Sequence, residues 1–451
     1  DLAGAKRGSV YGRIGTCTQE YGTLATWAID LLNIFTGHMD EPGGAMFPKA
    51  AGFAANTVGQ PGSGRGVTTG RYRSRVSGAP EVFGEIPITC LAEEIETPGE
   101  GQVRALITVA SNPVLSTPNG PRLANALDRL EFMVSMDIYV SETSRHADVI
   151  LPAPSPLEDS HYDVAFPQLS WRNHARFSEP VFDLPAGAQH EWVTLMKLVA
   201  IAEGRDASLP GAQLAADDFA RDAAKLFGEK AAAVVESTSH LEGPLRLLDV
   251  ALRTGPYGDQ FGEKPDGLNL AKVQAAPGGI DLGELKPRLP ELLRTAGGKI
   301  NLAPAQIIED LARPLADLGR PTSPMVIIGR RDVRSNNSWM HNLPLLAKGP
   351  ERCTALVHPD DAQRLGLADG AMARITSGGG SVEARVELCA DMMPGVVSLP
   401  HGWGHNLPGT RLTLASQRAG ANLNALLDDR QRDPLSGNAV LNGIAVELQP
   451  A

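Results

Sequence analysis

The sequence predicts an α/β protein in which a doubly wound, mostly parallel sheet is followed by a small β-barrel. Between residues 103 and 152, short apolar runs alternate with a helical segment and a brief crossover, and this order is typical of a parallel sheet. After the proline-containing stretch at 320–324, alternating apolar residues and tight turns take over, and a barrel is a common way to close such a β unit. We therefore predict three domains, residues 1–78, 79–320 and 321–451.

Length, composition and charge narrow the class of protein. A chain of 451 residues with 42% hydrophobic and 21% charged residues is expected to fold into two or three globular domains. Its net charge of -11 argues against a nucleic-acid partner, which would need a clustered basic face. No apolar run approaches the ~20 residues that span a bilayer, and no signal-peptide pattern opens the chain. We expect neither a nucleic-acid partner nor a membrane segment in this chain.

The first predicted domain contains one strong helix signal. Leu24, Trp27 and Leu31 recur at helical spacing within residues 22–35, and Gly37 supplies a stop signal. The glycine-rich stretch at 54–70 is predicted to be a loop.

The second predicted domain contains the parallel sheet. VRALITVA (103–110) and FMVSMD (132–137) are predicted strands, and Asn119–Arg129 between them is a predicted helix with Pro121 in its first turn. A third strand, DVILP, ends at Pro152. Later in this domain, HEWVTLMKLVAIAEG and AADDFARDAAKLF show the amphipathic spacing of helices.

The third predicted domain has strand patterning. MVIIG is a predicted strand, and a short helix should begin after Pro359 and end at Gly366. Val382, Ala384, Val386 and Leu388 alternate with charged residues, and GGG before them makes a hairpin turn. VVSLP and IAVELQ are further predicted strands.

Polar side chains follow two strands of the predicted sheet. The loop ASNPVLSTPNG places Asn112 and Ser116 before a helix N-terminus, which attracts phosphate. Asp137 and Thr143 follow the next strand, where a carboxylate can hold a ribose hydroxyl or a guanine donor edge. Ligands collect at this edge of a wound sheet. The alternatives are a plain Asn-Pro turn and a capping role for Asp137.

The third domain adds polar loops of the same character. GRRDVRSNNSWMHN (329–342) gathers three arginines and three asparagines after a strand, and arginine suits bidentate pyrophosphate contacts. HGWGH (401–405) holds two histidines four residues apart, but its glycines predict a loop rather than a zinc-binding helix. Asn422 and Asn424 could contact a heterocycle or cap a turn.

The cysteines do not indicate a metal site or a nucleophile. Cys17, Cys90, Cys353 and Cys389 lie far apart without a CxxC spacing, and no Ser-His-Asp elbow, P-loop or GxGxxG is present. Scattered cysteines suit a reducing compartment, so we predict a cytoplasmic protein. The residues alone indicate a large nucleotide-type ligand spread over two domains, without a recognisable catalytic group.

Six segments in this order resemble the molybdopterin oxidoreductases of the dimethyl sulfoxide reductase and formate dehydrogenase superfamily. They are GTCTQEYGT with TGHMDEPGG, ASNPVLSTPNG, SMDIYVSETSRHADVILP, GRRDVRSNNSWMHN, LPHGWGH and ANLNALLDDRQRDPLSG. The resemblance implies a subunit that binds molybdenum or tungsten through two molybdopterin guanine dinucleotides. It further implies two α/β domains, of which residues 1–78 are the end of the first, and a C-terminal six-stranded double-psi β-barrel.

The sequence departs from this family at its beginning. The cysteine cluster of a [4Fe-4S] centre and the segment with the metal ligand are absent from this chain. We therefore interpret it as the C-terminal part of a longer polypeptide, inactive alone, with the [4Fe-4S] centre expected only in the missing portion.

The resemblance also implies which residues contact the cofactor, while no catalytic or metal-ligating residue is assigned. Each matches by position a family residue near one of the dinucleotides: Thr18 and Gln19 at a pterin, Asn112 and Ser116 at a guanosine diphosphate, Asp137 and Thr143 at its guanosine, Glu191 near the same nucleotide, Arg331, Ser335 and Asn336 at pyrophosphate and pterin, and His401 and Asn424 at the pterin rings. Cys17, close to Gln19, is expected to be a bystander.

The implied function is electron or oxygen-atom transfer at the metal. Formate oxidation and the reduction of an oxyanion or N-oxide are the candidate reactions, with a small-molecule substrate and an electron-transfer subunit or carrier as partners. Two alternatives remain: a non-redox metal-pterin hydratase and a non-catalytic cofactor-binding module.

Overall fold

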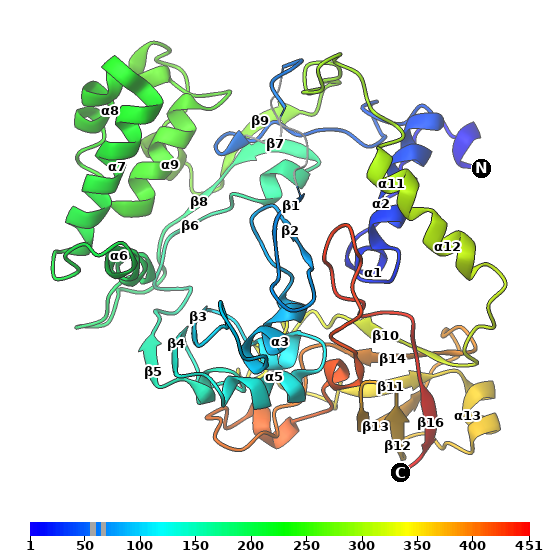
Figure 1. The fold of residues 1–451 in the computed structure, drawn as a ribbon. Helices are drawn as coiled ribbons and strands as arrows, with labels where there is room; N and C mark the ends of the chain where they lie inside the picture. The colour runs from blue at the N-terminus through cyan, green and yellow to red at the C-terminus, as the bar shows by residue number, and fades with distance from the viewer. Residues whose placement is uncertain (55–59, 65–68) are drawn as a thin grey trace. The chain divides into compact units, whose positions relative to one another are not determined.

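The computed structural model describes residues 1–54, 60–64 and 69–451, which form two compact units built from interleaved segments (Figure 1). Part of the loop predicted at 54–70 lies outside the described residues. The first unit comprises residues 1–10, 32–66 and 153–300, and the second unit comprises residues 11–31, 67–152 and 301–451.

Helices dominate the first unit, as the amphipathic segments predict. Leu248 and Leu252 of its core are at most 5% exposed and pack with Phe177. Its elements are the helices α6 (Glu191–Ala202), α7 (Gly211–Phe227), α8 (Ala231–Ser237), α9 (Gly243–Thr254) and α10 (Leu270–Gln274), the strand pair β6 (His161–Tyr162) and β8 (Phe177–Ser178), and the strand pair β7 (Arg172–Ala175) and β9 (Ile280–Glu284).

The predicted helix at 22–35 is confirmed as α2 (Gly22–Phe35). Leu24 is 5% exposed, and Gly37 adopts a left-handed φ of 74° after the helix. Before α2, the short helix α1 (Ile14–Cys17) carries the GTC triplet. Further along the chain, β1 (Thr69–Arg73) and β2 (Pro80–Val82) form an antiparallel pair.

The second unit contains the predicted parallel sheet. The strands β3 (Ala105–Val109), β4 (Phe132–Asp137) and β5 (Val149–Pro152) lie in sequence order, and both pairs are parallel. Leu123 and Leu127 bury one side of a helix against Met133 of β4. The helices of this region are α3 (Leu91–Glu96), α4 (Pro113–Ser116) and α5 (Gly120–Leu127).

A seven-stranded sheet forms the C-terminal part of the second unit, and it curls into a half-barrel. Its order is β15-β10-β14-β11-β13-β12-β16, with parallel pairs β10·β14 and β11·β13. The elements are β10 (Val326–Arg330), β11 (Thr354–Val357), α13 (Pro359–Leu365), β12 (Met372–Thr376), β13 (Ser381–Leu388), β14 (Val396–Pro400), β15 (Ile444–Ala445) and β16 (Glu447–Pro450); α11 (Ala305–Asp310) and α12 (Ala312–Asp317) precede them.

The local predictions for this sheet hold with three exceptions, the first of which is that IAVELQ, predicted as one strand, is divided between β15 and β16. Gly366 ends α13 in a left-handed conformation, and β12 pairs antiparallel with β13 across the glycine turn. Ala384 and Val386 point into the core, but Leu388 at the strand end is 39% exposed. The strand β11 was not predicted, since its four residues, TALV, are too few to show alternation.

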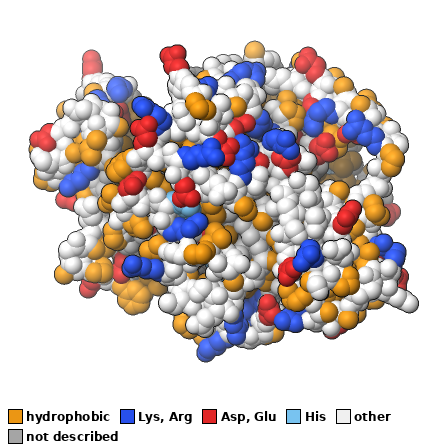
Figure 2. Space-filling view, turned by 60° about the horizontal axis from the view of Figure 1, so that its bottom comes forward, with side chains coloured by type: hydrophobic (Ala, Val, Ile, Leu, Met, Phe, Trp, Pro, Cys, Tyr) orange, Lys and Arg blue, Asp and Glu red, His pale blue; other side chains and the backbone are white. Residues whose placement is uncertain are grey.

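The surface carries charges of both signs. On the face drawn in Figure 2, basic and acidic side chains are interspersed rather than gathered by sign. Among the helices of the described residues, none has the length and apolar character needed to cross a membrane.

Candidate functional site

Asn112 and Thr143 meet at the carboxyl edge of the parallel sheet. Asn112 follows β3 and Thr143 follows β4, so their loops lie side by side. The Thr143 hydroxyl donates to Asn112 Oδ1 at 2.7 Å and accepts from the backbone N–H of Val114 at 3.0 Å. Asn112 Nδ2 donates to Glu142 Oε2 at 2.8 Å. These bonds fix the loop that leads into α4.

Asp137, the last residue of β4, lies at the same edge of the sheet. Its carboxylate accepts from the backbone N–H of Tyr139 at 3.1 Å and from the Ser141 hydroxyl at 3.2 Å. Asp137 is 3% exposed, and burial raises the pKa of its carboxyl group above the usual range despite these bonds. A buried carboxylate at a strand end is a suitable acceptor for ligand N–H or O–H groups.

A second carboxyl edge lies in the seven-stranded sheet. Because β10 and β14 are parallel with Arg330 opposite Pro400, the residues that follow them emerge together. Arg331 is exposed and donates from Nη2 to Asn337 Oδ1. Burial and the nearby Arg331 charge lower the pKa of His401 to about 4, so this ring is neutral at pH 7. A guanidinium and a neutral imidazole therefore share this edge.

Ser335 and Asn336 complete the loop after β10. Ser335 is 2% exposed, and its hydroxyl donates to the Asp332 carbonyl at 2.9 Å. Asn336 is exposed and adopts a left-handed φ of 40°. The Asn336 amide thus faces outward, whereas the Ser335 hydroxyl bonds within the loop.

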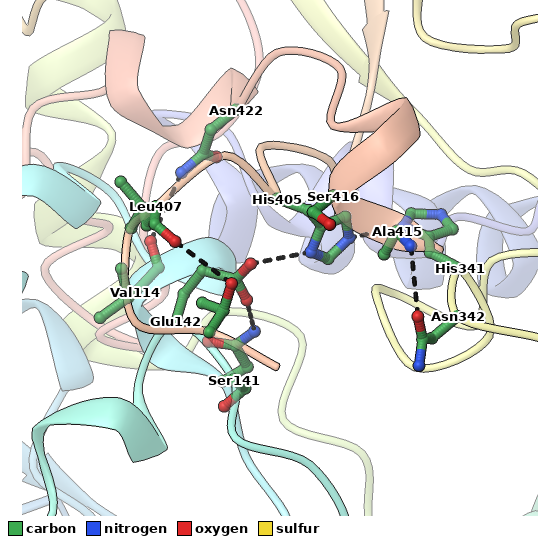
Figure 3. Close-up of polar contacts among 12 residues, drawn as sticks. Val114, Ser141, Glu142, His341, Asn342, His405, Leu407, Ala415, Ser416 and Asn422 are labelled. Carbon is green, nitrogen blue, oxygen red and sulfur yellow. Dashed lines mark hydrogen bonds and ion pairs between the residues drawn. The ribbon is translucent and has the colours of Figure 1, made fainter. Parts of the chain in front are cut away.

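Buried side chains join the two edges within the second unit (Figure 3). Glu142 Oε1 and His405 Nδ1 are 2.9 Å apart, and His405 Nε2 and His341 Nδ1 are 2.8 Å apart. Asn424, on the 3-10 helix η9 (Leu423–Leu426), donates from Nδ2 to the Leu115 carbonyl at 2.5 Å. The predicted residues Asn112, Thr143 and Asn424 therefore belong to one connected network.

The GTCTQEYGT loop is linked through Asn442 to the strand β10. Asn442 Nδ2 donates to the Thr18 hydroxyl at 2.9 Å, and Asn442 Oδ1 accepts from the backbone N–H of Gly329 at 2.9 Å. Gln19 bonds within its own loop, donating to the Thr16 carbonyl at 3.2 Å. Cys17 Sγ lies 3.9 Å from the Thr26 hydroxyl. Thr18 is therefore tied to the end of β10.

Two predicted contacts, Ser116 and Glu191, lie at neither of the two strand edges. Ser116 is exposed at the end of α4, and Glu191 is the first residue of α6 in the first unit. The roles assigned to them remain predictions.

The network includes three residues that were not among the predicted contacts: Glu142, His341 and His405. The sequence carried a signal for two of them, since Glu142 precedes Thr143 in the strand-end loop and His405 is the second histidine of HGWGH. The hydrogen bond between Glu142 and His405 joins positions 263 residues apart, and a local pattern cannot show such a contact.

A cavity of about 520 Å³ lies beside this network in the second unit. Its lining includes Asn125 on α5, Arg145 after β4, and the loop residues Gly404, Asn406 and Asn422. Amides, one guanidinium and glycine backbone give this cavity a polar side.

Two family models match the chain in order. The molybdopterin oxidoreductase model matches residues 9–200, and the molydopterin dinucleotide binding domain model matches residues 325–445. The second match covers the curled sheet and its polar loops.

Among curated proteins, similarity extends over much of the chain. The assimilatory nitrate reductase catalytic subunit of Bacillus subtilis is 29% identical over 221 residues, covering 46% of this chain and 30% of that protein. The NADPH-Fe(3+) oxidoreductase subunit alpha of Geobacter sulfurreducens is 25% identical over 317 residues, covering 69% of this chain and 29% of that protein. The chain thus spans less than a third of the length of these relatives.

The fold has a solved counterpart. Acetylene hydratase from Pelobacter acetylenicus superposes with a TM-score of 0.57 and 18% identity, covering 82% of this chain and 47% of that chain. At this identity the likeness concerns the fold alone. Together with the two family matches and the polar edges that they span, it leads to one assignment: the chain belongs to the molybdopterin oxidoreductase family, within the dimethyl sulfoxide reductase and formate dehydrogenase superfamily.

Proposed function

We propose that this chain is the dinucleotide-binding part of a molybdenum or tungsten oxidoreductase that transfers electrons or an oxygen atom, of the formate dehydrogenase type or of the oxyanion and N-oxide reductase type. The observation that carries the proposal is a line of hydrogen bonds through Glu142, His405 and His341. It connects the loops at the carboxyl ends of the strands in two different sheets. One edge belongs to a parallel sheet and the other to the sheet matched by the dinucleotide-binding model. Such edges are where wound sheets bind nucleotides.

The residues at these edges fit a phosphorylated pterin nucleotide. Arg331 offers an exposed guanidinium for a pyrophosphate, and the neutral ring of His401 can donate to or accept from a pterin. Asn424 Oδ1 is buried and has no hydrogen-bond partner within the described ranges, so it is a candidate acceptor for a ring N–H. Asp137 would accept the donor edge of guanine.

The chain's own contribution is to hold and orient the group. A bound metal-pterin centre would supply the redox chemistry, and the surrounding residues would position it and tune its electrostatics. Arg331 would balance phosphate charge, because an unpaired charge in a poorly solvated site is costly. Thr18 and Gln19 would contact a pterin from the N-terminal side, and Glu191 would contact a nucleotide.

Several finer expectations are part of the same proposal. The parallel sheet would belong to a doubly wound domain, the curled sheet would correspond to the six-stranded double-psi barrel, and the domain limits would be 1–78, 79–320 and 321–451. Two guanine dinucleotides would be bound, and an electron-transfer subunit or carrier would act as partner in the cytoplasm.

Cofactor content tests the binding role. We expect Arg331→Ala in the full-length protein to lower molybdenum or tungsten and acid-released guanine nucleotide at least fivefold. The Tm of the cofactor-free protein should be unchanged, because Arg331 is exposed. Metal is measured by mass spectrometry and nucleotide by chromatography. Arg334→Ala is the matched control, since Arg334 is an exposed arginine of the same loop. Unchanged metal content in Arg331→Ala would remove this residue from the site.

Activity of the metal-loaded full-length protein tests the reaction class. Dye-linked oxidation of formate and dye-linked reduction of nitrate and of an N-oxide cover the proposed chemistry. Turnover in any of these assays supports an oxidoreductase. Hydration of an unsaturated substrate without dye reduction would instead favour the hydratase alternative, and a loaded protein inactive in every assay would favour a non-catalytic module.

A further inference from the structure

Glu142, His405 and His341 form an unbroken, buried line of ionisable groups (Figure 3). Glu142 follows β4, His341 lies in the loop after β10, and His405 lies in the loop after β14. Their exposed fractions are 0%, 7% and 1%. Dinucleotide binding as proposed above uses these side chains only to join the two strand edges, and it does not explain why the joining groups are ionisable.

The hydrogen bonds restrict where protons can lie. Glu142 has a lowered pKa: burial raises it, but the bonds from His405 and Asn112 outweigh this effect. An ionised carboxylate only accepts, so His405 Nδ1 must carry a proton. Between His405 Nε2 and His341 Nδ1 there is room for one proton only, because two N–H groups would repel at 2.8 Å.

Three arrangements satisfy these restrictions, and His341 is neutral in two of them. In the first, His405 is neutral, and His341 carries its proton on Nδ1 and donates to His405 Nε2. In the second, His405 is an imidazolium that donates from Nε2 to His341 Nδ1, and His341 carries its proton on Nε2. His341 is neutral in both, but its tautomer differs, whereas in the third His341 is the imidazolium.

The surroundings keep His341 neutral. Burial is the main cause that lowers its pKa to about 4, and the neighbouring His405 lowers it further. The charges of Asp332 and Glu142 raise the pKa of His341, whereas the charge of Arg352 lowers it. A cavity of about 30 Å³, large enough for a water molecule, is lined by His341, by apolar residues such as Trp403, and by the charged residues Asp332, Arg334, Glu351, Arg352 and Arg418.

We propose that Glu142, His405 and His341 form a proton relay that takes up a proton at His341 Nε2 and stores it on His405, beside Glu142. A proton from solvent water bonds to Nε2 of His341, the Nδ1 proton of His341 passes to His405 Nε2, and the charge rests on His405. His341 Nε2 is buried and has no partner within the residues that the structure describes, and His341 lines the small cavity, so a water molecule in that cavity is the route by which a proton can reach this nitrogen. Return of the proton reverses each step.

The stored charge lies where the two strand edges meet. With His405 protonated, the 2.9 Å contact with Glu142 becomes a buried ion pair, which strengthens the link between the loop after β4 and the loop after β14. The relay therefore couples proton uptake to the contact between the loop after β4 and the loop after β14.

Histidine-specific ¹⁵N labelling of the 451-residue chain tests the relay. The chain has 10 histidines, so their ring nitrogens can be followed by NMR through a pH titration and assigned by single substitutions. We expect His341 to change from the Nδ1–H to the Nε2–H tautomer at the pH at which His405 gains its proton. His358, which caps α13 and lies near Asp360, is the internal control for the tautomer change at His341.

Two outcomes would overturn the relay: His341 keeps one tautomer while His405 becomes protonated, or His341 itself becomes the imidazolium at that pH. Glu142→Gln should abolish the tautomer change, because the carboxylate that holds the charge is removed. Asp332→Asn should leave it in place, because the charge does not rest on His341. The wild-type titration decides the question even where Glu142→Gln fails to fold.

Discussion

At the scale of single residues, Glu142 allows a direct test of the network. Both of its carboxylate oxygens accept bonds, from Asn112 and from His405. In Glu142→Gln, only one oxygen remains to accept and the negative charge is lost, so one of the two bonds must break or reverse its direction. We expect a loss of about 2–4 kcal/mol in the free energy of unfolding, measured with urea.

Glu131→Gln is the matched control for this substitution. Glu131 pairs with Arg104 at 3.2 Å, and both side chains are more than 60% exposed. Exposed pairs contribute under about 1 kcal/mol, so the control should change stability little. Equal effects of the two substitutions would contradict the structural role of Glu142.

His341 and His401 predict a dependence of stability on pH. Both have a folded-state pKa of about 4 against an ordinary value of 6.5. The unfolded chain therefore binds more protons between pH 4 and 6.5, and stability is lost as pH falls through this window. Full shifts would contribute up to about 3 kcal/mol each, and less for His401, which is partly exposed.

Urea unfolding at pH 7 and at pH 5 measures this effect. We expect wild type to lose more stability than the double variant His341→Gln/His401→Gln between these pH values, because the variant lacks both groups. A loss of the same size in both proteins would show that other groups cause the pH dependence.

At the scale of elements, local sequence patterns predicted the helices and strands whose limits depend on residues close together in the sequence. The helix Gly22–Phe35 and the strand Phe132–Asp137 appear with the predicted limits, because apolar periodicity and a glycine stop operate over a few residues. The site was predicted only in part. Glu142, His405 and His341 were missed, since hydrogen bonds between distant loops depend on the topology of two sheets.

Gly402 shows how closely two of these loops approach. It has a φ of 95°, and a Cβ at this position would lie 2.1 Å from the Asn337 carbonyl oxygen. Backbone oxygen cannot move as a flexible side chain can. We therefore expect Gly402→Ala to destabilise the chain by about 2–4 kcal/mol, from the left-handed backbone and the clash together.

Gly378→Ala is the control for Gly402→Ala. Nothing lies within 4 Å of the Cβ that would be added there, and its φ is outside the left-handed region. This substitution should change the urea midpoint only slightly. A mild effect at Gly402 as well would mean that the loops carrying Asn337 and His401 can separate at little cost.

At the scale of the whole molecule, each compact unit is assembled from three separate stretches of chain. In the second unit, Asp433 accepts from both the backbone N–H and the hydroxyl of Thr23, and Asn442 donates to Thr18. The curled sheet nevertheless has its own core, since Ile327, Ile375, Leu399 and their neighbours all come from residues 325–448.

This arrangement makes a prediction for residues 321–451 expressed alone. The fragment keeps its apolar core, so it should unfold cooperatively, but it loses the bonds to Thr18, Thr23 and Glu142. We expect a single urea transition, monitored by near-UV circular dichroism, with a midpoint well below that of the 451-residue chain.

Restoring residues 67–152 in a fusion should recover part of the difference, because Glu142 and the Leu115 carbonyl return as partners of His405 and Asn424. A fragment without any cooperative transition would mean that the curled sheet is not an independent domain, and the proposed limit at residue 321 would then be wrong.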